Sequence, residues 1–300
     1  MKQTVSVSKP LHGLPRLRNG ARAYLKRWKR HPFSALMRLL STLCMAVTLL
    51  MLMSIIWDIL SKGIPNLKPS LFSLTYTTEN QSLLPALINT FAITLLSLLV
   101  AVPLGVGGAV YLSEYAHRES VLVKSVRITA VTLAGIPSIL YGLFGMMFFV
   151  ITLKMGLSLL SGALTLSLMV LPLILRTTEE ALLSVPDGYR EGSYGLGAGK
   201  LRTVWRIVLP PASPGILAGI VLAIGRIVGE TAALLFTAGT VAQLPQGLLS
   251  SGRTLSVHMY VLSGEGLHIG EAYATAAVLL VFVTLMNGLS GLISRKIVKE

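Results

Sequence analysis

Residues 83–113 read LLPALINTFAITLLSLLVAVPLGVGGAVYLS and contain no formal charge. A helix of about 20 residues crosses the hydrocarbon core of a bilayer, so this stretch is long enough to span it. Apolar and polar residues do not alternate with the two-residue period of a barrel strand, which favours a helix. Further apolar runs occur at 39–57, 128–153, 155–175, 207–252 and 272–294. The sequence therefore predicts an all-α, polytopic membrane protein with six transmembrane helices.

The composition of the 300-residue chain excludes several other classes of protein. Hydrophobic residues make up 53% and charged residues only 13%, whereas a soluble domain has about 25% charged residues. The mean hydropathy is +0.73. A cytosolic globule, a disordered chain and a disulfide-rich secreted module are thereby excluded. The single cysteine, Cys44, cannot form an intramolecular disulfide or a cysteine metal cluster.

Positive charge predicts the orientation of the six spans. With the N-terminus inside, twenty of the 26 Lys and Arg residues lie in inner segments and four lie in outer loops. Cytoplasmic loops carry this excess, so we expect both termini in the cytoplasm of a bacterium with the spans in its plasma (inner) membrane. The net charge of +14 then reflects topology, and we expect no nucleic-acid partner.

These spans predict a simple domain organisation. Residues 1–32 form a basic cytoplasmic leader that contacts anionic membrane lipid or solvent. Residues 33–82 contain the first transmembrane helix, retained rather than cleaved, and an outer loop. Residues 83–294 form a five-helix transmembrane core, and 295–300 form a cytoplasmic tail. Gly, Pro and Ser punctuate 240–270, which we expect to be an interfacial or re-entrant stretch on the outer side.

The inner loop 176–208 and the start of the fifth run carry the most specific pattern. Its spacing, E-x-x, three residues, G, nine residues, I-x-L-P, resembles the EAA motif of bacterial ABC importers. The positions concerned are Glu191, Gly192, Ser193, Gly197, Ile207, Leu209 and Pro210. Small residues here would let a short helix lie in a groove on a separate ATPase. Pro210 and Pro211 are expected to stop the helical segment, because proline has no backbone N–H. The alternative is an ordinary surface loop of turn residues.

The stretch 195–200, GLGAGK, looks like a phosphate-binding loop. A Walker loop needs glycine four residues before the Gly-Lys pair, and Ser or Thr after the lysine. Tyr194 and Leu201 stand at those positions. We therefore expect this chain to bind no cofactor itself, with ATP and Mg on a partner ATPase.

Over residues 84–293 the sequence resembles the PstA family, the permease subunits of bacterial phosphate ABC importers. The resemblance rests on the segments 135–145, 171–181 and 225–239 together with the inner loop. It implies the type I ABC importer permease fold, and as partners a second permease subunit (PstC-like), an ATPase dimer (PstB-like) and an extracytoplasmic phosphate-binding protein (PstS-like). Two departures are Gly192-Ser193 in place of Ala-Ala and Ala233 where proline is frequent.

The fifth run contains the only formal charges deep inside a span. Arg226 is expected near the middle of a helix over 214–237, where a charge usually faces water or a partner. At about 100° per residue, Arg226, Glu230 and Thr237 share one face with small residues, and that face can line a pathway or approach another helix. We predict a substrate pathway formed by Arg226, Glu230, Thr231 and Thr237.

The residue types in this pathway suit phosphate. Arginine keeps its charge and donates two parallel hydrogen bonds to an oxyanion. Phosphate retains a proton near pH 7 that Glu230 can accept, whereas sulfate has none. The competing interpretation is an i,i+4 ion pair between Arg226 and Glu230 that neutralises itself.

Other functions remain open from the residues alone. The chain could be a permease subunit for another oxyanion, such as sulfate or molybdate. A membrane-embedded enzyme acting on phospholipid is a different class, but no nucleophile–base set is present and no catalytic residue is assigned. An assembly scaffold would not need a buried charge. His258 and His268 are interpreted as isolated outer residues, so no metal site is predicted.

Overall fold

The structure is a computed structural model that describes residues 32–117 and 120–297. The predicted leader, apart from its last residue, and the end of the predicted tail lie outside the described residues. The chain divides into two units, Met1–Asp58 and Ile59–Glu300. Most of helix α2 (Pro32–Gly63) belongs to the first unit. It is uncharged between Arg38 and Asp58, with a mean hydropathy of 2.4 in its candidate membrane span, as predicted for a first transmembrane helix.

All regular structure in the described part of the second unit is helical. A short 3₁₀ turn, η2 (Ile64–Asn66), and a second one, η3 (Pro69–Phe72), lead into the bundle. The helices that follow are α3 (Leu84–Val110), α4 (Val121–Ala134), α5 (Ser138–Gly145), α6 (Leu159–Leu183), α7 (Asp187–Gly195), α8 (Lys200–Thr203), α9 (Leu209–Val228), α10 (Ala232–Thr237), α11 (Leu255–Glu265) and α12 (Ile269–Ile297). Three π-helical turns accompany them, namely η4 (Tyr111–Tyr115), η5 (Met146–Thr152) and η6 (Val204–Val208).

Helix α6 forms the centre of this unit and packs against α3, α4, α5, α9 and α10. Its side chains Leu166, Met169 and Ile174 are buried in the core. Glycines on the neighbouring helices allow close approach. A Cβ atom on Gly219 of α9 would lie 2.0 Å from the Thr177 hydroxyl oxygen of α6. Small residues at helix interfaces are typical of membrane bundles, because they let backbones pack closely.

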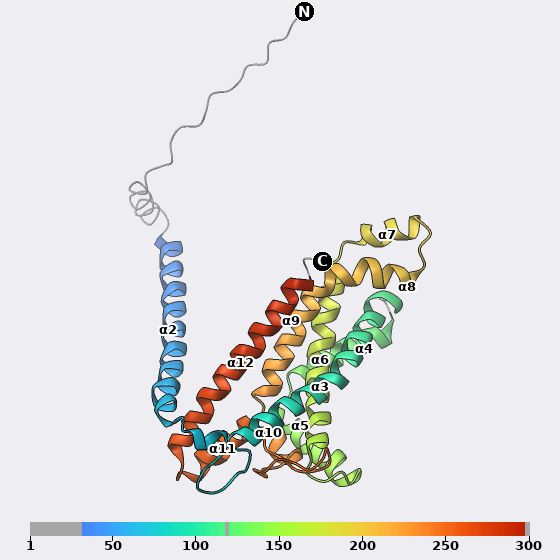
Figure 1. The fold of residues 1–300 in the computed structure, drawn as a ribbon. Helices are drawn as coiled ribbons and strands as arrows, with labels where there is room; N and C mark the ends of the chain where they lie inside the picture. The colour runs from blue at the N-terminus through green and yellow to red at the C-terminus, as the bar shows by residue number, and fades with distance from the viewer. Residues whose placement is uncertain (1–31, 118–119, 298–300) are drawn as a thin grey trace, which may run out of the picture. The chain divides into compact units, whose positions relative to one another are not determined.

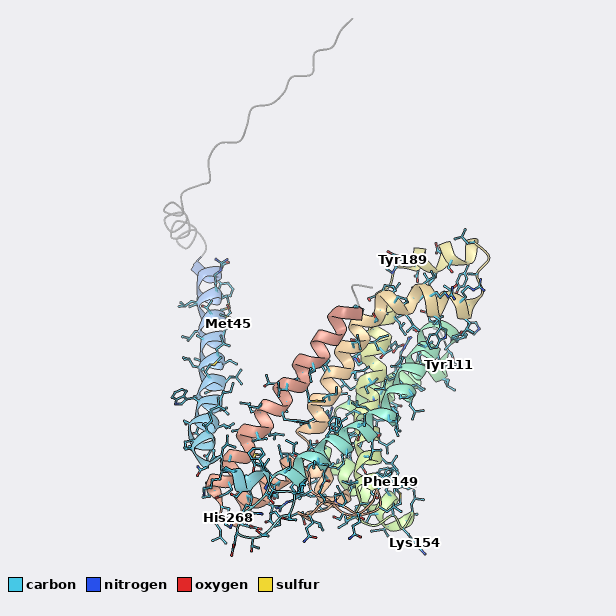
Figure 2. The ribbon with its side chains drawn as sticks, viewed as in Figure 1. Met45, Tyr111, Phe149, Lys154, Tyr189 and His268 are labelled. Atoms are coloured by element: carbon cyan, nitrogen blue, oxygen red, sulfur yellow. The ribbon has the colours of Figure 1, made fainter. Side chains whose placement is uncertain are left out.

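The two ends of the second unit are distinct (Figure 1). Helices α7 and α8 lie at one end, called here the α7 end, and α10 and α11 lie toward the opposite end, the α11 end. Figure 2 shows Tyr111 and Tyr189 at the α7 end, and Lys154 and His268 at the α11 end. This arrangement agrees with the predicted separation of the inner loop from the outer loops.

Among the described residues, five helices are long and apolar enough to cross a membrane, and a sixth span results if the bent pair α4 and α5–η5 counts as one. The predicted continuous span over 128–153 is wrong, because the chain bends by 103° between its two halves. Gly135 ends α4 and Pro137 precedes α5, and proline disfavours helical geometry in the residue before it. The predicted span over 155–175 begins at Leu159 instead, where the Ser158 side chain caps α6.

Two expectations about the fifth run are also wrong. Pro210 and Pro211 do not stop the helix, since one span runs from Lys200 to Val228. Pro210 lies in the first turn of α9, where a missing N–H is tolerated. At the other end, α9 stops at Val228 and α10 starts at Ala232, so 214–237 is a broken helix. The predicted re-entrant stretch contains α11, which at 11 residues is too short to span.

Candidate substrate pathway and coupling site

The two predicted pathway charges, Arg226 and Glu230, lie just before and within the break between α9 and α10. Arg226 lies in the last turn of α9, where the helix dipole favours a cation. Its side chain is half-buried, and it forms no ion pair with any carboxylate in the described part of the chain. The neutralising pair with Glu230 is therefore absent from this conformation.

Glu230 has a different partner. Its Oε1 atom accepts a hydrogen bond of 3.1 Å from the backbone N–H of Ala233 in the first turn of α10. The residue is only 8% exposed. A carboxylate that caps a helix start satisfies an N–H group that has no partner within the helix. This cap holds Glu230 beside the break and leaves Arg226 available to another anion.

A hydrogen bond from the segment around α11 holds the break between α9 and α10 in place. The Ser256 hydroxyl donates to the Glu230 carbonyl oxygen at 2.6 Å. Two residues of α3 bind the same segment: Asn89 donates to the carbonyl oxygen of Arg253 at 3.2 Å, and the Thr90 hydroxyl accepts from the Leu255 N–H at 2.8 Å. These buried bonds satisfy the irregular backbone that membrane depth would otherwise penalise. Asn89 and Thr90 thus connect α3 to the segment around α11 by hydrogen bonds.

The predicted small-residue face mostly packs against other helices. Gly219 faces α6, and Thr237 is fully buried with its hydroxyl bound to the Ala233 carbonyl. A Cβ on Gly142 of α5 would lie 2.7 Å from the Ala233 Cα atom. Thr231, in the break itself, is half-buried. Glu230 and Thr231 therefore lie in the break and Arg226 lies in the helical turn before it, whereas Thr237 ends α10 in packed surroundings.

His258, interpreted from sequence as an isolated outer residue, is buried beside Arg253, which is one of the four Lys and Arg residues assigned to outer loops. Arg253 is 3% exposed, and its guanidinium carbon lies 4.7 Å from the centre of the Tyr76 ring. His258 is fully buried with its ring edge-on to Tyr76. Burial, with the charge of Arg253 adding to it, lowers the pKa of His258 to about 3. The ring is thus neutral between pH 5 and 8.

At the α7 end, the backbone conformation at position 197 requires a glycine. Its φ angle is +80°, in the left-handed region that suits glycine. The N–H of Gly197 bonds to the carbonyl of Tyr194, and that of Ala198 bonds to the carbonyl of Ser193. Together these bonds form a Schellman motif that ends α7. Ser193 is buried, and its hydroxyl lies 2.8 Å from that of Thr203 in α8. This hydrogen bond joins α7 to α8.

The surface that this turn presents is apolar and basic. Leu196 is 91% exposed. An open hollow of about 450 Å³ lies beside it, lined by Gly188, Gly192, Ile207, Arg202 and Arg206 among others. Glu191 is exposed on α7. Among the predicted coupling residues, Gly192 and Ile207 therefore lie at this hollow, and Leu209 and Pro210 continue into α9 below it.

Comparison with known families decides the class of protein. Residues 101–299 match the model of the binding-protein-dependent transport system inner membrane component. The chain belongs to this family. It is 35% identical over 269 residues to a probable ABC transporter permease protein, YqgI, of Bacillus subtilis, covering 82% of this chain and 89% of the relative. It is 34% identical to the phosphate transport system permease protein PstA of Haemophilus influenzae, covering 88% and 94%.

Solved structures agree on the fold. A bacterial ABC transporter that imports alginate matches with a TM-score of 0.63 at 17% identity, covering 91% of this chain and 99% of that chain. The MetNI methionine ABC transporter in an inward-facing conformation matches with a TM-score of 0.57 at 22% identity, covering 71% and 93%. The predicted type I importer permease fold is confirmed. The chain is a permease subunit of an ABC importer and not an enzyme; it acts with a partner ATPase and a substrate-binding protein.

Sequence reasoning missed three features of the permease. Arg253 and His258 carry no local signal of burial, because their partner Tyr76 is distant in sequence. Leu196 was overlooked because it stands between two glycines in the apparent phosphate loop. Arg190 was counted only as a topology charge, although it is buried against Glu114.

Replacing Gly197 by alanine is expected to strain the turn that ends α7. A left-handed conformation costs a residue with a Cβ atom about 1–2 kcal/mol. Hydrogen exchange of the Gly197 and Ala198 amides should therefore accelerate by about fivefold to thirtyfold in the variant. Gly192→Ala is the matched control, because Gly192 is helical and a Cβ there meets no atom within 4 Å. Equal exchange in both variants would contradict this account of Gly197.

Proposed function

We propose that the permease imports inorganic phosphate, with Arg226 as the cation that the anion contacts in the membrane. The observation that supports this most is the half-buried Arg226 guanidinium, which has no carboxylate partner in the described residues. An unpaired charge at membrane depth is unfavourable by about 3 kcal/mol on insertion scales unless it meets water or an anion. Relatives from Mycoplasma pneumoniae and Haemophilus influenzae are named as phosphate transport system permease proteins, which favours phosphate over sulfate or molybdate.

The remaining parts of the machine follow from this proposal. A PstB-like ATPase dimer would bind the α7 end and hydrolyse ATP with Mg, so no cofactor is held by the permease itself. A PstC-like second permease subunit would supply the facing half of the pathway, and a PstS-like binding protein would dock at the α11 end. Both termini would then be cytoplasmic, with the spans in the bacterial inner membrane. The phosphate transport system permease protein PstC of Xylella fastidiosa is 31% identical to this chain.

Alternating access would use the contacts described above. Glu191 lies on α7, and Gly197 lies in the turn that ends this helix. Movement of α7 would tilt the long helix from Lys200 to Val228 and so displace Arg226. Contact with phosphate must be transient, because the anion also has to leave. Arg226 donates two parallel hydrogen bonds to an oxyanion in such a contact, and the second Glu230 oxygen can accept the phosphate proton.

The variant Glu230→Gln tests whether Glu230 discriminates between phosphate and sulfate. The glutamine oxygen can still cap the Ala233 N–H, so the variant removes the charge while keeping the fold. We expect phosphate uptake to fall by about tenfold and the preference for phosphate over sulfate to narrow, because a neutral amide no longer repels a fully deprotonated anion. The assay is uptake of radiolabelled phosphate and sulfate by vesicles that contain the complete complex.

Glu180→Gln, on the exposed surface of α6, is the matched control and should transport as the wild type does. If Glu230→Gln carries sulfate no better and phosphate no worse, Glu230 has no role in discrimination. If the wild-type complex takes up sulfate or molybdate in place of phosphate, the proposed substrate is wrong.

A further inference from the structure

Arg190 of α7 uses its whole guanidinium group in one buried cluster. Its Nε and one terminal nitrogen donate to the carboxylate of Glu114, at 3.2 Å and 2.7 Å. The terminal nitrogens also donate to the carbonyl oxygens of Leu182 and Val185, at 2.9 and 2.7 Å, and to Asp187 at 3.1 Å. The five N–H donors of arginine are thereby matched to acceptors.

Arg190 and Glu114 are sheltered from solvent, whereas the Asp187 side chain is 65% exposed. The side chains of Arg190 and Glu114 are only 11% and 4% exposed. The hydrogen bond to Glu114 raises the pKa of Arg190 above its ordinary value, although burial acts against it. Removing one partner of a buried pair is strongly unfavourable, because it leaves an uncompensated charge. The pair therefore holds its geometry as a fixed connection rather than a loose surface contact.

The partners of Arg190 come from different elements of the fold. Glu114 lies in the π-helical turn η4 that ends the α3 span, where Leu112 and Ser113 are buried with it. Leu182 lies in the last turn of α6 and Val185 just after it, where helical carbonyl oxygens lack partners within the helix. Glu114 and Arg190 are 76 residues apart in the chain. The cluster therefore joins α7, which otherwise packs mainly against α8 and η6, directly to the ends of two long spans.

We propose that the pair Arg190–Glu114, called here the Arg190 joint, transmits movement of α7 to α3 and α6. This inference rests on the proposed function, in which a partner ATPase moves α7. Glu191, the neighbouring residue, is exposed and forms no ion pair among the described residues. A force on α7 therefore reaches the α3 span through Arg190, which acts as a positioning residue.

The test compares uptake with ATP hydrolysis in the complete complex in vesicles, with inorganic phosphate and ATP supplied. Glu114→Gln keeps the shape of the acceptor but removes its charge. We expect the variant complex to assemble and hydrolyse ATP, while phosphate imported per ATP falls by at least tenfold. Glu179→Gln is the matched control. It weakens the Arg127–Glu179 contact, 2.7 Å long, which joins α4 to α6 without touching α7, and its ratio should stay within twofold of the wild type.

A second variant covers the case in which Glu114→Gln does not assemble. Arg190→Lys keeps a cation beside Glu114 but cannot reach all the acceptors of the planar guanidinium, so the ratio should fall by about threefold to tenfold. An unchanged ratio in an assembled Glu114→Gln complex, or in Arg190→Lys if only that variant assembles, overturns the proposal. Failure of the wild-type complex to import phosphate would instead contradict the proposed substrate. In that case the same ratio is measured with the anion that stimulates the wild-type ATPase.

Discussion

Arg226→Ala is expected to reduce phosphate uptake by at least a hundredfold while the complex still assembles. The guanidinium group lies in the last turn of α9, half-buried and without a carboxylate partner in the described residues. A charge-assisted bidentate contact with an oxyanion is roughly twice as strong as a neutral hydrogen bond. Its removal deprives the anion of its counter-charge at membrane depth. Uptake by vesicles and co-purification of the partner ATPase measure the two effects separately.

Arg226→Lys and Arg176→Ala complete this experiment. Lysine keeps the charge but loses the planar fork, so we expect an uptake rate between those of the wild type and the alanine variant. Arg176 forms an exposed ion pair with Glu180 on α6, and its replacement by alanine should leave uptake near the wild-type rate. A normal rate in Arg226→Ala would contradict the pathway role. Loss of assembly together with uptake would indicate a structural role instead.

The long helices could be predicted from sequence because their cause is local. An uncharged apolar run of sufficient length has one stable form in a bilayer, a helix whose backbone bonds are internal. The end of α7 is similarly local, since Gly197 supplies the left-handed conformation that a Schellman motif requires. The family resemblance added the class of transporter, which neither composition nor periodicity could give.

The break at 229–231 could not be predicted in the same way. No proline stands there, and apolar residues continue on both sides of Gly229-Glu230-Thr231. The break is held by the Glu230 cap on Ala233 and by the Ser256 hydroxyl, which comes from a segment 26 residues away. An interpretation of 214–237 as one regular helix therefore placed Glu230 and Thr237 on one face, although they belong to different parts of a broken helix.

The surroundings of individual arginine residues could not be predicted from the sequence either. Arg190, Arg253 and Arg226 look equivalent in a count of positive charges, yet their surroundings differ. Arg190 is paired with a carboxylate, Arg253 lies against an aromatic ring, and Arg226 has neither in the described residues. The first two partners, Glu114 and Tyr76, are distant in sequence and meet them only through the fold. The proposed contact between Arg226 and a transported anion rests on this third arrangement.

Leu196→Glu is expected to weaken binding of the partner ATPase by at least thirtyfold. Leu196 is 91% exposed on the turn after α7. Burial of a leucine side chain contributes about 1.5–3 kcal/mol, and a glutamate would in addition carry its charge into the interface. Arg202 and Arg206 line the adjacent hollow, so an acidic residue introduced here would also compete with acidic groups of the partner. Co-purification of the ATPase with the permease, measured at several salt concentrations, gives the change in affinity.

Leu267→Glu provides the matched control for this experiment. Leu267 is 82% exposed, next to His268 at the α11 end. The same substitution there adds the same charge to the permease without touching the α7 surface, so ATPase binding should remain within twofold of the wild type. Equal binding by both variants would show that Leu196 lies outside the interface. Equal loss in both would show that an added exposed carboxylate disturbs the permease as a whole. Loss in Leu196→Glu alone requires that the apolar turn after α7 is itself covered by the ATPase.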